Sequence, residues 1–347
     1  MTSDVAQQKE QRFSVGQHSE LSVSNVSGHI AVDADEGSEI VVRYSKAGSF
    51  RTQDNIQVDI RKDGNRVTVQ TRPNVGGLIN FGRGRSVDYN ITVPRDCAVR
   101  LHAVSADVEL HGPRAETGIQ TVSGGVRMKD IAGDITVTTV SGDIDASQLS
   151  GTLVARTTSG NAKVAASRLR RFSINSVSGD FTLETPLLND EHCNAKTVSG
   201  DLNLQLPSDA GATVQLKSIS GNVSCELPAE IIKAGRRHWQ GRINGGGGNV
   251  EMNSVSGDLR ILRSVRGWSD GPGPDNNTDW TPTPPEVLHA ADESHGDSGM
   301  ATDVQSAAES DAVEEPAGEG GPDPTAEILG ALERGEITVE EAMEKLG

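Results

Sequence analysis

The residues with the most regular spacing for chemistry are acidic side chains that follow a repeated Ser-Gly pair. The acidic members of this column are Asp107, Asp143, Asp180, Asp201 and Asp258. Carboxylates stacked on neighbouring turns are one way to bind calcium. The GGxGxD spacing of calcium-binding nonapeptide rolls is missing, however, and neutral residues such as Gly125 and Asn161 interrupt the column. We therefore expect these Asp and Asn side chains to cap turns, with a calcium ladder as the alternative.

Two further patterns hold reactive side chains. A serine precedes the Gly position in every copy, but no copy has a nearby His-Asp pair to mark it as a nucleophile, so we expect a structural hydroxyl. The segment Asp190-Glu191-His192-Cys193 contains metal-ligand types without a second Cys/His pair at zinc spacing. The three cysteines are odd in number and widely spaced, which indicates no disulfide framework. We predict no catalytic residue, no metal and no cofactor.

A sequence repeat defines the elements that position these residues. The phrase Val-Ser-Gly-Asp-Ile, with variants, occurs nine times, and from residue 106 its third position recurs at steps of 18 to 21 residues. The final step of 36 reads as two coils, one without its signature. Two and four residues after the Gly position the sequence is apolar, as at Val126 and Met128, and the residue between is polar. This alternation predicts a strand with one face in a core.

A coil of this length cannot bury its apolar face alone, so neighbouring coils must stack and enclose one interior. No helical pattern occurs between residues 12 and 265. The sequence therefore predicts an all-β protein, a parallel β-solenoid of 18–21-residue coils over residues 12–265. With only ten aromatic residues in the chain, the core must be filled by Val, Ile, Leu and Ala. The less regular strands within 12–100 are expected to form the first coils and cover that end of the stack.

Charge divides the rest of the chain. The 347 residues carry a net charge of −17, which arises after residue 265: residues 266–322 have a net charge of −12 and residues 323–347 of −5. Residues 266–322 are rich in Gly, Pro, Ser and acid and predict a disordered acidic linker, and residues 1–11 predict a disordered tail. No signal-peptide h-region and no run of about 18 apolar residues is present. The expected location is cytoplasmic, with the cell surface or the membrane periphery as the alternative.

The repeats also carry a family resemblance. The tandem VSGD-I-x-V coils, the strand ending in Ile91-Thr-Val-Pro94, and the closing segment GGGGNVEMNSVSGDL at 245–259 resemble the bacterial putative-adhesin family, a domain of unknown function. The resemblance covers residues 12–265 and departs from the pattern at Ala106 and Thr158. It implies a β-solenoid without established catalysis, with some relatives linked to cell-envelope stress, and it provides no functional residues to transfer.

Residues 323–347 predict a small helical hairpin. Asp323-Pro324 is typical of a helix start, and Thr338-Val-Glu-Glu341 is a capping box. The string LERGEITVEEAMEKL resembles the short helical hairpin called a short C-terminal domain. Because 25 residues are too few for an independent core, we expect self-association or docking on a partner protein, with docking on the solenoid or disorder as alternatives. The apolar residues proposed for this contact are Leu329, Leu332, Met343 and Leu346.

Two irregular segments within the solenoid are the other candidate contacts. Residues 76–85 are glycine-rich, and residues 231–242 hold a basic-aromatic cluster in the doubled interval. The candidate contact residues are Phe81, Arg83, Arg85, Arg236, Arg237, Trp239 and Arg242. Loops carry binding more often than scaffolds do, and an anionic lipid or the acidic linker would match this charge. Flexible insertions with solvated charge are the alternative.

These observations favour a non-catalytic scaffold or adhesin-like protein, with a role in the envelope stress response implied by the resemblance alone. Protein partners or self-association are expected, and the acidic hairpin argues against nucleic acid because phosphate binding needs positive charge. One alternative is a structural protein that polymerises end to end. A carbohydrate-active enzyme is less favoured, because two of the three tryptophans, Trp268 and Trp280, lie in the linker and leave few aromatic platforms for sugar.

Overall fold

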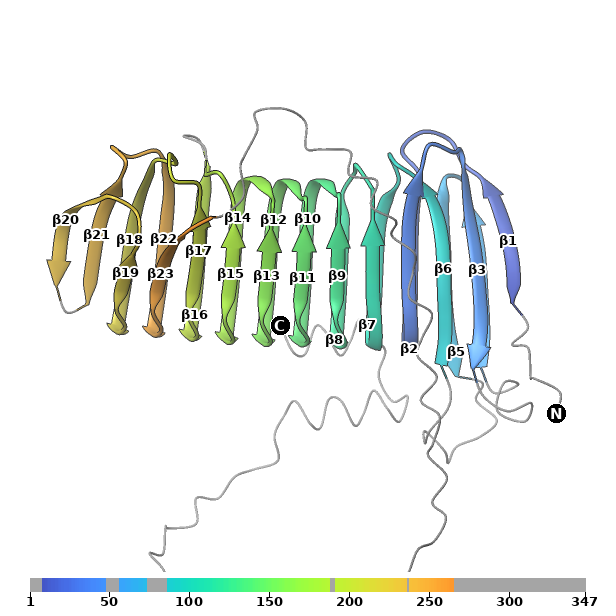
Figure 1. The fold of residues 1–347 in the computed structure, drawn as a ribbon. Helices are drawn as coiled ribbons and strands as arrows, with labels where there is room; N and C mark the ends of the chain where they lie inside the picture. Colours follow the sequence, from blue (N-terminus) through green and yellow to red (C-terminus); the bar gives the residue numbers. More distant parts are fainter. Residues whose placement is uncertain (1–7, 48–55, 74–85, 188–190, 236, 265–347) are drawn as a thin grey trace, which may run out of the picture.

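The computed structural model describes residues 8–47, 56–73, 86–187, 191–235 and 237–264. These residues form strands and connecting turns without any helix, and the 23 strands join in one hydrogen-bonded sheet that winds into a solenoid (Figure 1). The predictions for residues 1–7 and 265–347, which include the linker and the hairpin, lie outside the described residues. The disordered tail predicted for residues 1–11 is wrong for residues 9–11, which belong to a strand that begins at Lys9 and pairs with residues 42–44.

The strands fall into three groups along the chain. The first group is β1 (Lys9–Ser14), β2 (Glu20–Asp35), β3 (Glu39–Ala47), β4 (Ile56–Asp63), β5 (Arg66–Pro73), β6 (Ser86–Pro94) and β7 (Ala98–His111). The regular coils hold β8 (Thr117–Ser123), β9 (Val126–Lys129), β10 (Ala132–Ser141), β11 (Ile144–Ser147), β12 (Ser150–Ser159), β13 (Ala162–Ala165), β14 (Arg168–Ser178), β15 (Phe181–Glu184), β16 (His192–Ser199) and β17 (Leu202–Leu206). The last group is β18 (Ala212–Ser220), β19 (Val223–Cys225), β20 (Ala229–Gly235), β21 (His238–Ile243), β22 (Gly248–Ser256) and β23 (Leu259–Arg263).

Each regular coil contributes one strand before its Ser-Gly turn and one after it. We call the sheet of preceding strands the long face and the sheet of following strands the short face. On both faces the strands pair in parallel with equivalent residues side by side, so that Ser123 pairs with Ser141 and Val126 with Ile144. Val126, Ile144 and Leu202, which the repeat places inside, are all at most 2% exposed. The predicted parallel β-solenoid is therefore confirmed.

The order of coils in space differs from their order along the chain. On the long face β16 pairs with β22 and β22 pairs with β18, while on the short face β17 pairs with β23 and β23 with β19. The last coil is thus inserted between the two coils that precede it, as Figure 1 shows for β22 and β23. The 36-residue interval holds no coil without a signature, which corrects the sequence interpretation. It contains the antiparallel hairpin of β20 and β21, which extends the long face and returns the chain.

The N-terminal end is built in a similar way. β2 runs through both faces and pairs in parallel with β7 along its length, although 62 residues separate the two strands in sequence. Beyond β2 lie β5 and then β4 on the long face, and β6, β3 and β1 on the short face. The outer strands β4, β3 and β1 pair antiparallel. These strands do cover this end, as the sequence predicts, although with antiparallel strands at the edges.

Aliphatic side chains fill the single core, and aromatic side chains contribute few of its members, of which Tyr89 and Phe181 are the largest fully buried ones. The Tyr89 ring lies 6.0 Å from that of Tyr44, and its hydroxyl is 2.6 Å from the Thr71 hydroxyl. Burial raises the pKa of Tyr89 to about 12, because the phenolate would lose its solvation.

The glycine of the repeated turn is required by close packing between coils. A Cβ placed on Gly142 would lie 2.2 Å from the carbonyl oxygen of Gly124, the equivalent residue of the adjacent coil. The same clash recurs at Gly179 and Gly200, where φ is also positive. Any side chain here would push neighbouring coils apart, so the glycine column sets the spacing of the stack.

Candidate interaction surface

The acidic column, which we considered above as a possible calcium site, instead accepts hydrogen bonds from the backbone of the next coil. The Oδ1 atom of Asp143 accepts a hydrogen bond from the N–H of Asn161 at 2.8 Å, and Oδ1 of Asn161 accepts one from Asp180 at 3.0 Å. The chain of bonds continues to Asp201 at 2.9 Å and then to Asp258 at 2.8 Å. Each side chain thus caps the turn beside it, and neutral Asn serves as well as Asp. This geometry supports the turn-capping interpretation.

Two hydroxyl columns line the turn, and they face opposite ways. Thr121 and Thr197 each precede the serine of the turn by two residues, and their side chains point inward and are buried. Their hydroxyls donate to the carbonyl oxygens of Ser123 and Ser199 at 3.3 and 3.0 Å. The serines of the Ser-Gly pair are themselves exposed, apart from Ser27, which is half-buried. The sequence predicted that the serine hydroxyl of the Ser-Gly pair bonds to the turn backbone. In these coils the hydroxyl that does so belongs to the threonine two residues earlier.

Between these columns lies a row of exposed aliphatic side chains, which we call the aliphatic ladder. Its members are Val177, Val198, Val255 and Ile219, in spatial order, with exposed fractions of 52, 49, 46 and 61%. They are neighbours because the serines that follow them pair in register across β14, β16, β22 and β18. Parallel strands lie about 4.8 Å apart, so the ladder is a continuous apolar ridge. Insertion of the last coil places Val255 between Val198 and Ile219 in this row.

The same column is different elsewhere in the solenoid. Val104 and Val122 are 6 and 3% exposed, and the exposed position 158 is threonine. Val26 and Val140 are half-buried. Within this column of the described residues, fully exposed large aliphatic side chains therefore occur only in four adjacent coils. Clustered apolar side chains on a surface mark interaction sites more often than scattered ones do.

A shallow groove of about 380 Å³ runs beside the ladder. It is lined by Thr197, Lys217, Ser218, Ile219, Arg237, Asn253, Ser254 and Val255. Lys217 forms an ion pair of 2.9 Å with Glu251 and remains half exposed, and Arg237 is exposed. Aliphatic and basic side chains therefore meet in one groove.

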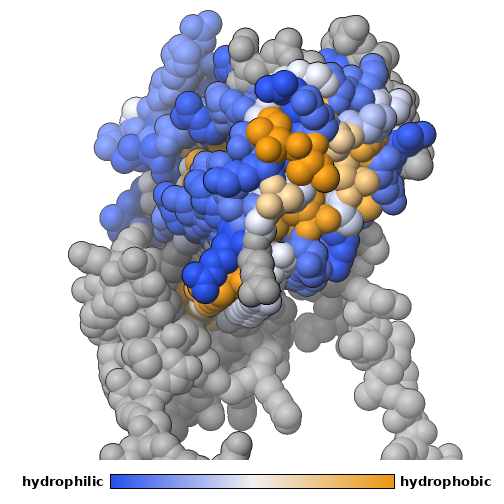
Figure 2. Space-filling model, turned by 90° about the vertical axis from the view of Figure 1, so that its left-hand side faces the viewer, coloured by the Kyte–Doolittle hydropathy of each residue, from blue (hydrophilic) through white to orange (hydrophobic). Residues whose placement is uncertain are grey.

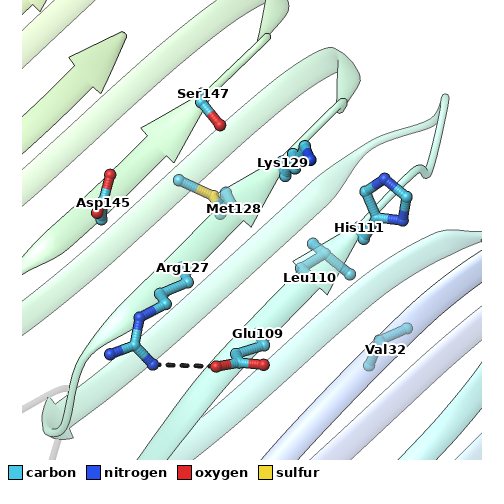
Figure 3. A pocket seen from close by; sticks show the side chains of 9 residues that line it. All are labelled: Val32, Glu109, Leu110, His111, Arg127, Met128, Lys129, Asp145 and Ser147. Carbon is cyan, nitrogen blue, oxygen red and sulfur yellow. Dashed lines mark hydrogen bonds and ion pairs between the residues drawn. The ribbon is translucent and has the colours of Figure 1, made fainter. Parts of the chain in front are cut away.

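A second depression, of about 180 Å³, lies on the short face (Figure 3). Its polar side chains alternate in charge from coil to coil: Glu109 lies 3.0 Å from Arg127, and Asp145 follows on the next strand. Apolar Leu110 and Met128 are buried beneath them. Alternating charges at paired positions stabilise strand register, so we interpret this depression as part of a solvated sheet surface.

The predicted contact residues are only partly described. Phe81, Arg83, Arg85, Arg236, Leu329, Leu332, Met343 and Leu346 lie outside the described residues. Arg237 borders the groove, and Arg242 points outward from β21, 3.8 Å from Glu230. Trp239 was predicted to be a surface contact, but it is half-buried and packs against the core, and its ring lies over Gly241. It closes the end of the interior and leaves the basic residues as the outward members of that cluster.

The cysteines and the candidate metal segment are structural. Cys193 is buried and His192 exposed, because consecutive residues of β16 point to opposite faces, so the two side chains do not converge. Burial raises the pKa of Cys97 to about 11 and of Cys193 to about 12. Cys225 is half-buried on the edge strand β19, and burial raises its pKa as well. No group of three or more His, Cys, Asp or Glu side chains suited to a metal ion occurs among the described residues.

Fold and surface together define a repeat protein that displays side chains in ladders along a rigid stack. The model of the family called Toastrack DUF4097 matches residues 18–262, and the chain belongs to this family. The resemblance to an adhesin-like family of unknown function, read from the repeats, is thereby confirmed. No curated protein matches the chain.

Several solved structures are similar to it, including the following three. A putative adhesin from Bacteroides fragilis is 13% identical with a TM-score of 0.43, over 74% of this chain and 97% of that one. A putative adhesin from Parabacteroides distasonis is 11% identical with a TM-score of 0.40, over 74 and 98%. A putative cell adhesion protein from Clostridium sporogenes is 11% identical with a TM-score of 0.25, over 74 and 100%. Within the described part of this chain, no helix has the length and apolarity needed to span a membrane.

Proposed function

We propose that this Toastrack protein is a non-catalytic, adhesin-like scaffold that binds a partner protein of the cell envelope along its aliphatic ladder. The observation that carries the proposal is the exposure of four large aliphatic side chains in one column of adjacent coils. When a partner covers such a ridge and removes it from water, the free energy of the complex is lowered, so binding is favoured.

The groove beside the ladder indicates the chemistry of that partner. Ile219 and Val255 lie in the same groove as Lys217 and Arg237. A segment with aliphatic side chains along one side and acidic side chains along the other would complement both. Complementary charge would orient the segment, and the aliphatic contacts would provide most of the affinity.

The absence of catalysis is part of the proposal. The side chains that could take part in chemistry have structural roles: the acidic column accepts hydrogen bonds from the turn backbone, and Cys193 is packed in the core. We place the protein in the cytoplasm, with its envelope partner reached at the membrane periphery. The predicted hairpin at 323–347 would add a second association site at the end of the acidic linker.

Threonine substitution tests the ladder while preserving the fold, because the column already holds an exposed Thr158. The variant V177T/V198T/V255T/I219T keeps β-branched side chains and removes the apolar ridge. We expect it to lose the specific partners that the full-length protein captures from solubilised envelope. The matched variant T158V, which extends the ladder by one coil, should retain or strengthen the same capture.

An identical set of partners for all three proteins would refute the ladder as the binding surface. The purified protein should also release no reducing ends from a panel of polysaccharides. Release that depends on a residue of the solenoid would refute the non-catalytic assignment.

A further inference from the structure

The two faces of the solenoid end at different places. The short face ends at β19, which pairs only with β23, while the long face continues past β18 through β21 to β20. β20 is therefore an edge strand that overhangs the end of the core, and all seven of its residues are exposed. Figure 2 looks onto this end and shows apolar side chains gathered there. Among them Ile231 and Ile232 are 61 and 47% exposed.

A bulge in β20 gives this edge a symmetrical pattern. The register against β21 shifts between Ile231 and Lys233, so that Ile232 is the extra residue. Ala229 pairs with buried Ile243 and Ala234 with core-packed Trp239, so both alanines lie on the inner side of the strand. The same pairing sets the two charged residues on the other side.

Glu230 and Lys233 are those outward residues. Glu230 pairs with exposed Arg242, and Lys233 pairs with Gln240. Without the bulge, residues 230 and 233 would point to opposite faces, because strand side chains alternate. With the bulge, the six residues Ala-Glu-Ile-Ile-Lys-Ala have the same pattern from either end: an inward-facing alanine, then an outward-facing charged residue, then an isoleucine. The directions in which the side chains point are thus symmetrical about the centre of the strand, and the two outward side chains carry opposite charges.

We propose that this end docks on the same end of a second copy, with β20 antiparallel to β20 about a two-fold axis. An axis between residues 231 and 232 pairs Ile231 with Ile232 of the second copy. It also places Glu230 opposite Lys233 of the second copy, twice by symmetry. The four isoleucines then cover one another at the centre, and two ion pairs flank them. Opposite charges at paired positions favour this arrangement, and like charges would oppose it.

In the described part of the chain, the other end of the solenoid does not offer a matching surface. Its edge strands are β1, with the sequence KEQRFS, and β4, with the sequence IQVDIRKD. Charged residues on an edge discourage strand addition. Because, judged from the described residues, only the β20 end exposes large aliphatic side chains, the contact is isologous and closes on itself, so it forms a dimer. The structure thus favours a dimer over the end-to-end filament that the sequence leaves open.

Charge reversal tests the pairing in the full-length protein. We expect the wild-type chain to be dimeric in sedimentation analysis at micromolar concentration. In K233E both ion pairs become Glu-Glu contacts, and the dissociation constant should rise at least about tenfold. In E230K/K233E the charges are exchanged and complementary again, so the dimer should return. The control K62E reverses a charge on the opposite edge strand, β4, and should leave the dimer unchanged.

A cysteine pair tests the register. In a C225S background, A229C/A234C should form a disulfide-linked dimer on oxidation, because these two positions face each other across the axis. Each single cysteine variant should remain unlinked by that bond. A monomeric wild-type protein, or a dimer that K233E leaves intact, would overturn the proposal, and the second result would assign the contact to another part of the chain.

Discussion

The glycine column allows the spacing of the coils to be tested by one methyl group. Gly142 does not have a left-handed backbone, so the variant G142A adds a steric contact without a φ penalty. Its Cβ would lie 2.2 Å from the Gly124 oxygen, whereas carbon and oxygen in contact are normally about 3.3 Å apart. The two coils must therefore separate locally by about 1 Å.

Such a displacement affects the turn around it. Overpacking costs about 1–3 kcal/mol, and each weakened hydrogen bond costs about 1 kcal/mol. The bonds at risk include Gly142 N–H to the Ser159 carbonyl, at 3.3 Å, and the cap that Asp143 makes to the next coil. We expect G142A to lower the free energy of unfolding by about 3 kcal/mol.

Gly118 provides the matched control in strand β8. A Cβ there would meet its nearest atom at 3.9 Å, which is ordinary contact. G118A should be neutral or should stabilise the fold by up to about 1 kcal/mol, because alanine restricts the unfolded chain. Urea unfolding followed by circular dichroism measures both variants. Equal midpoints for G142A and G118A would refute the claim that glycine sets the coil spacing.

Three further predictions concern ionisable groups. D143A should lose about 1–2 kcal/mol of unfolding free energy and D143N distinctly less, while EDTA should leave the melting temperature of the wild type unchanged; a large EDTA effect would restore the calcium alternative. Because the folded pKa of Tyr89 is raised from 10.0 to about 12, its contribution is present below pH 10 and is lost as the pH rises toward 12, by about 3 kcal/mol; Y89F should remove this loss in pH-dependent unfolding, and an equally steep loss in Y89F would contradict it. In the native protein Cys225 should react first with a thiol reagent and Cys97 and Cys193 only on unfolding; rapid modification of all three would show that the core is open.

The solenoid was predictable because local alternation and long-range repetition agree. Val126 and Ile144 occupy the same column of the sequence, and the only arrangement that buries both is a stack of coils in register. The role of the acidic column followed from its tolerance of Asn161, since a turn cap needs one acceptor atom and a calcium site needs several charges.

The order of the coils was not predictable from the repeat. The coil that holds Val255 has the same signature as its neighbours, and nothing in a signature states which equivalent strand it pairs with. Pairing depends on the path of the chain, and here the β20–β21 hairpin redirects it. The 36-residue interval was the only sign of this change in the sequence, but an interval of this length is equally compatible with an extra coil and with an inserted hairpin.

The proposed interaction surface was missed for a related reason. Valine at the ladder position is buried at Val122 and exposed at Val198, so residue type alone does not distinguish the two environments. The packing of Trp239 was not predicted, because its basic neighbours suggested an exposed side chain, while the half-buried ring lies over Gly241 and packs against the core. Knowledge of where each face ends was needed to recognise Ile231 and Ile232 as the overhang.

The order of side chains in the aliphatic ladder and the strands that form the apolar end both depend on the insertion of the last coil, and a pair of cysteine variants measures that insertion directly. Ser199 pairs with Ser256, and Ser256 pairs with Ser220. Neighbouring positions lie about 4.8 Å apart and alternate ones about 10 Å, and a disulfide needs Cα atoms within about 7 Å. On oxidation, S199C/S256C should form an internal disulfide and S199C/S220C should not. The reverse result would show that the coils stack in chain order and would contradict the account.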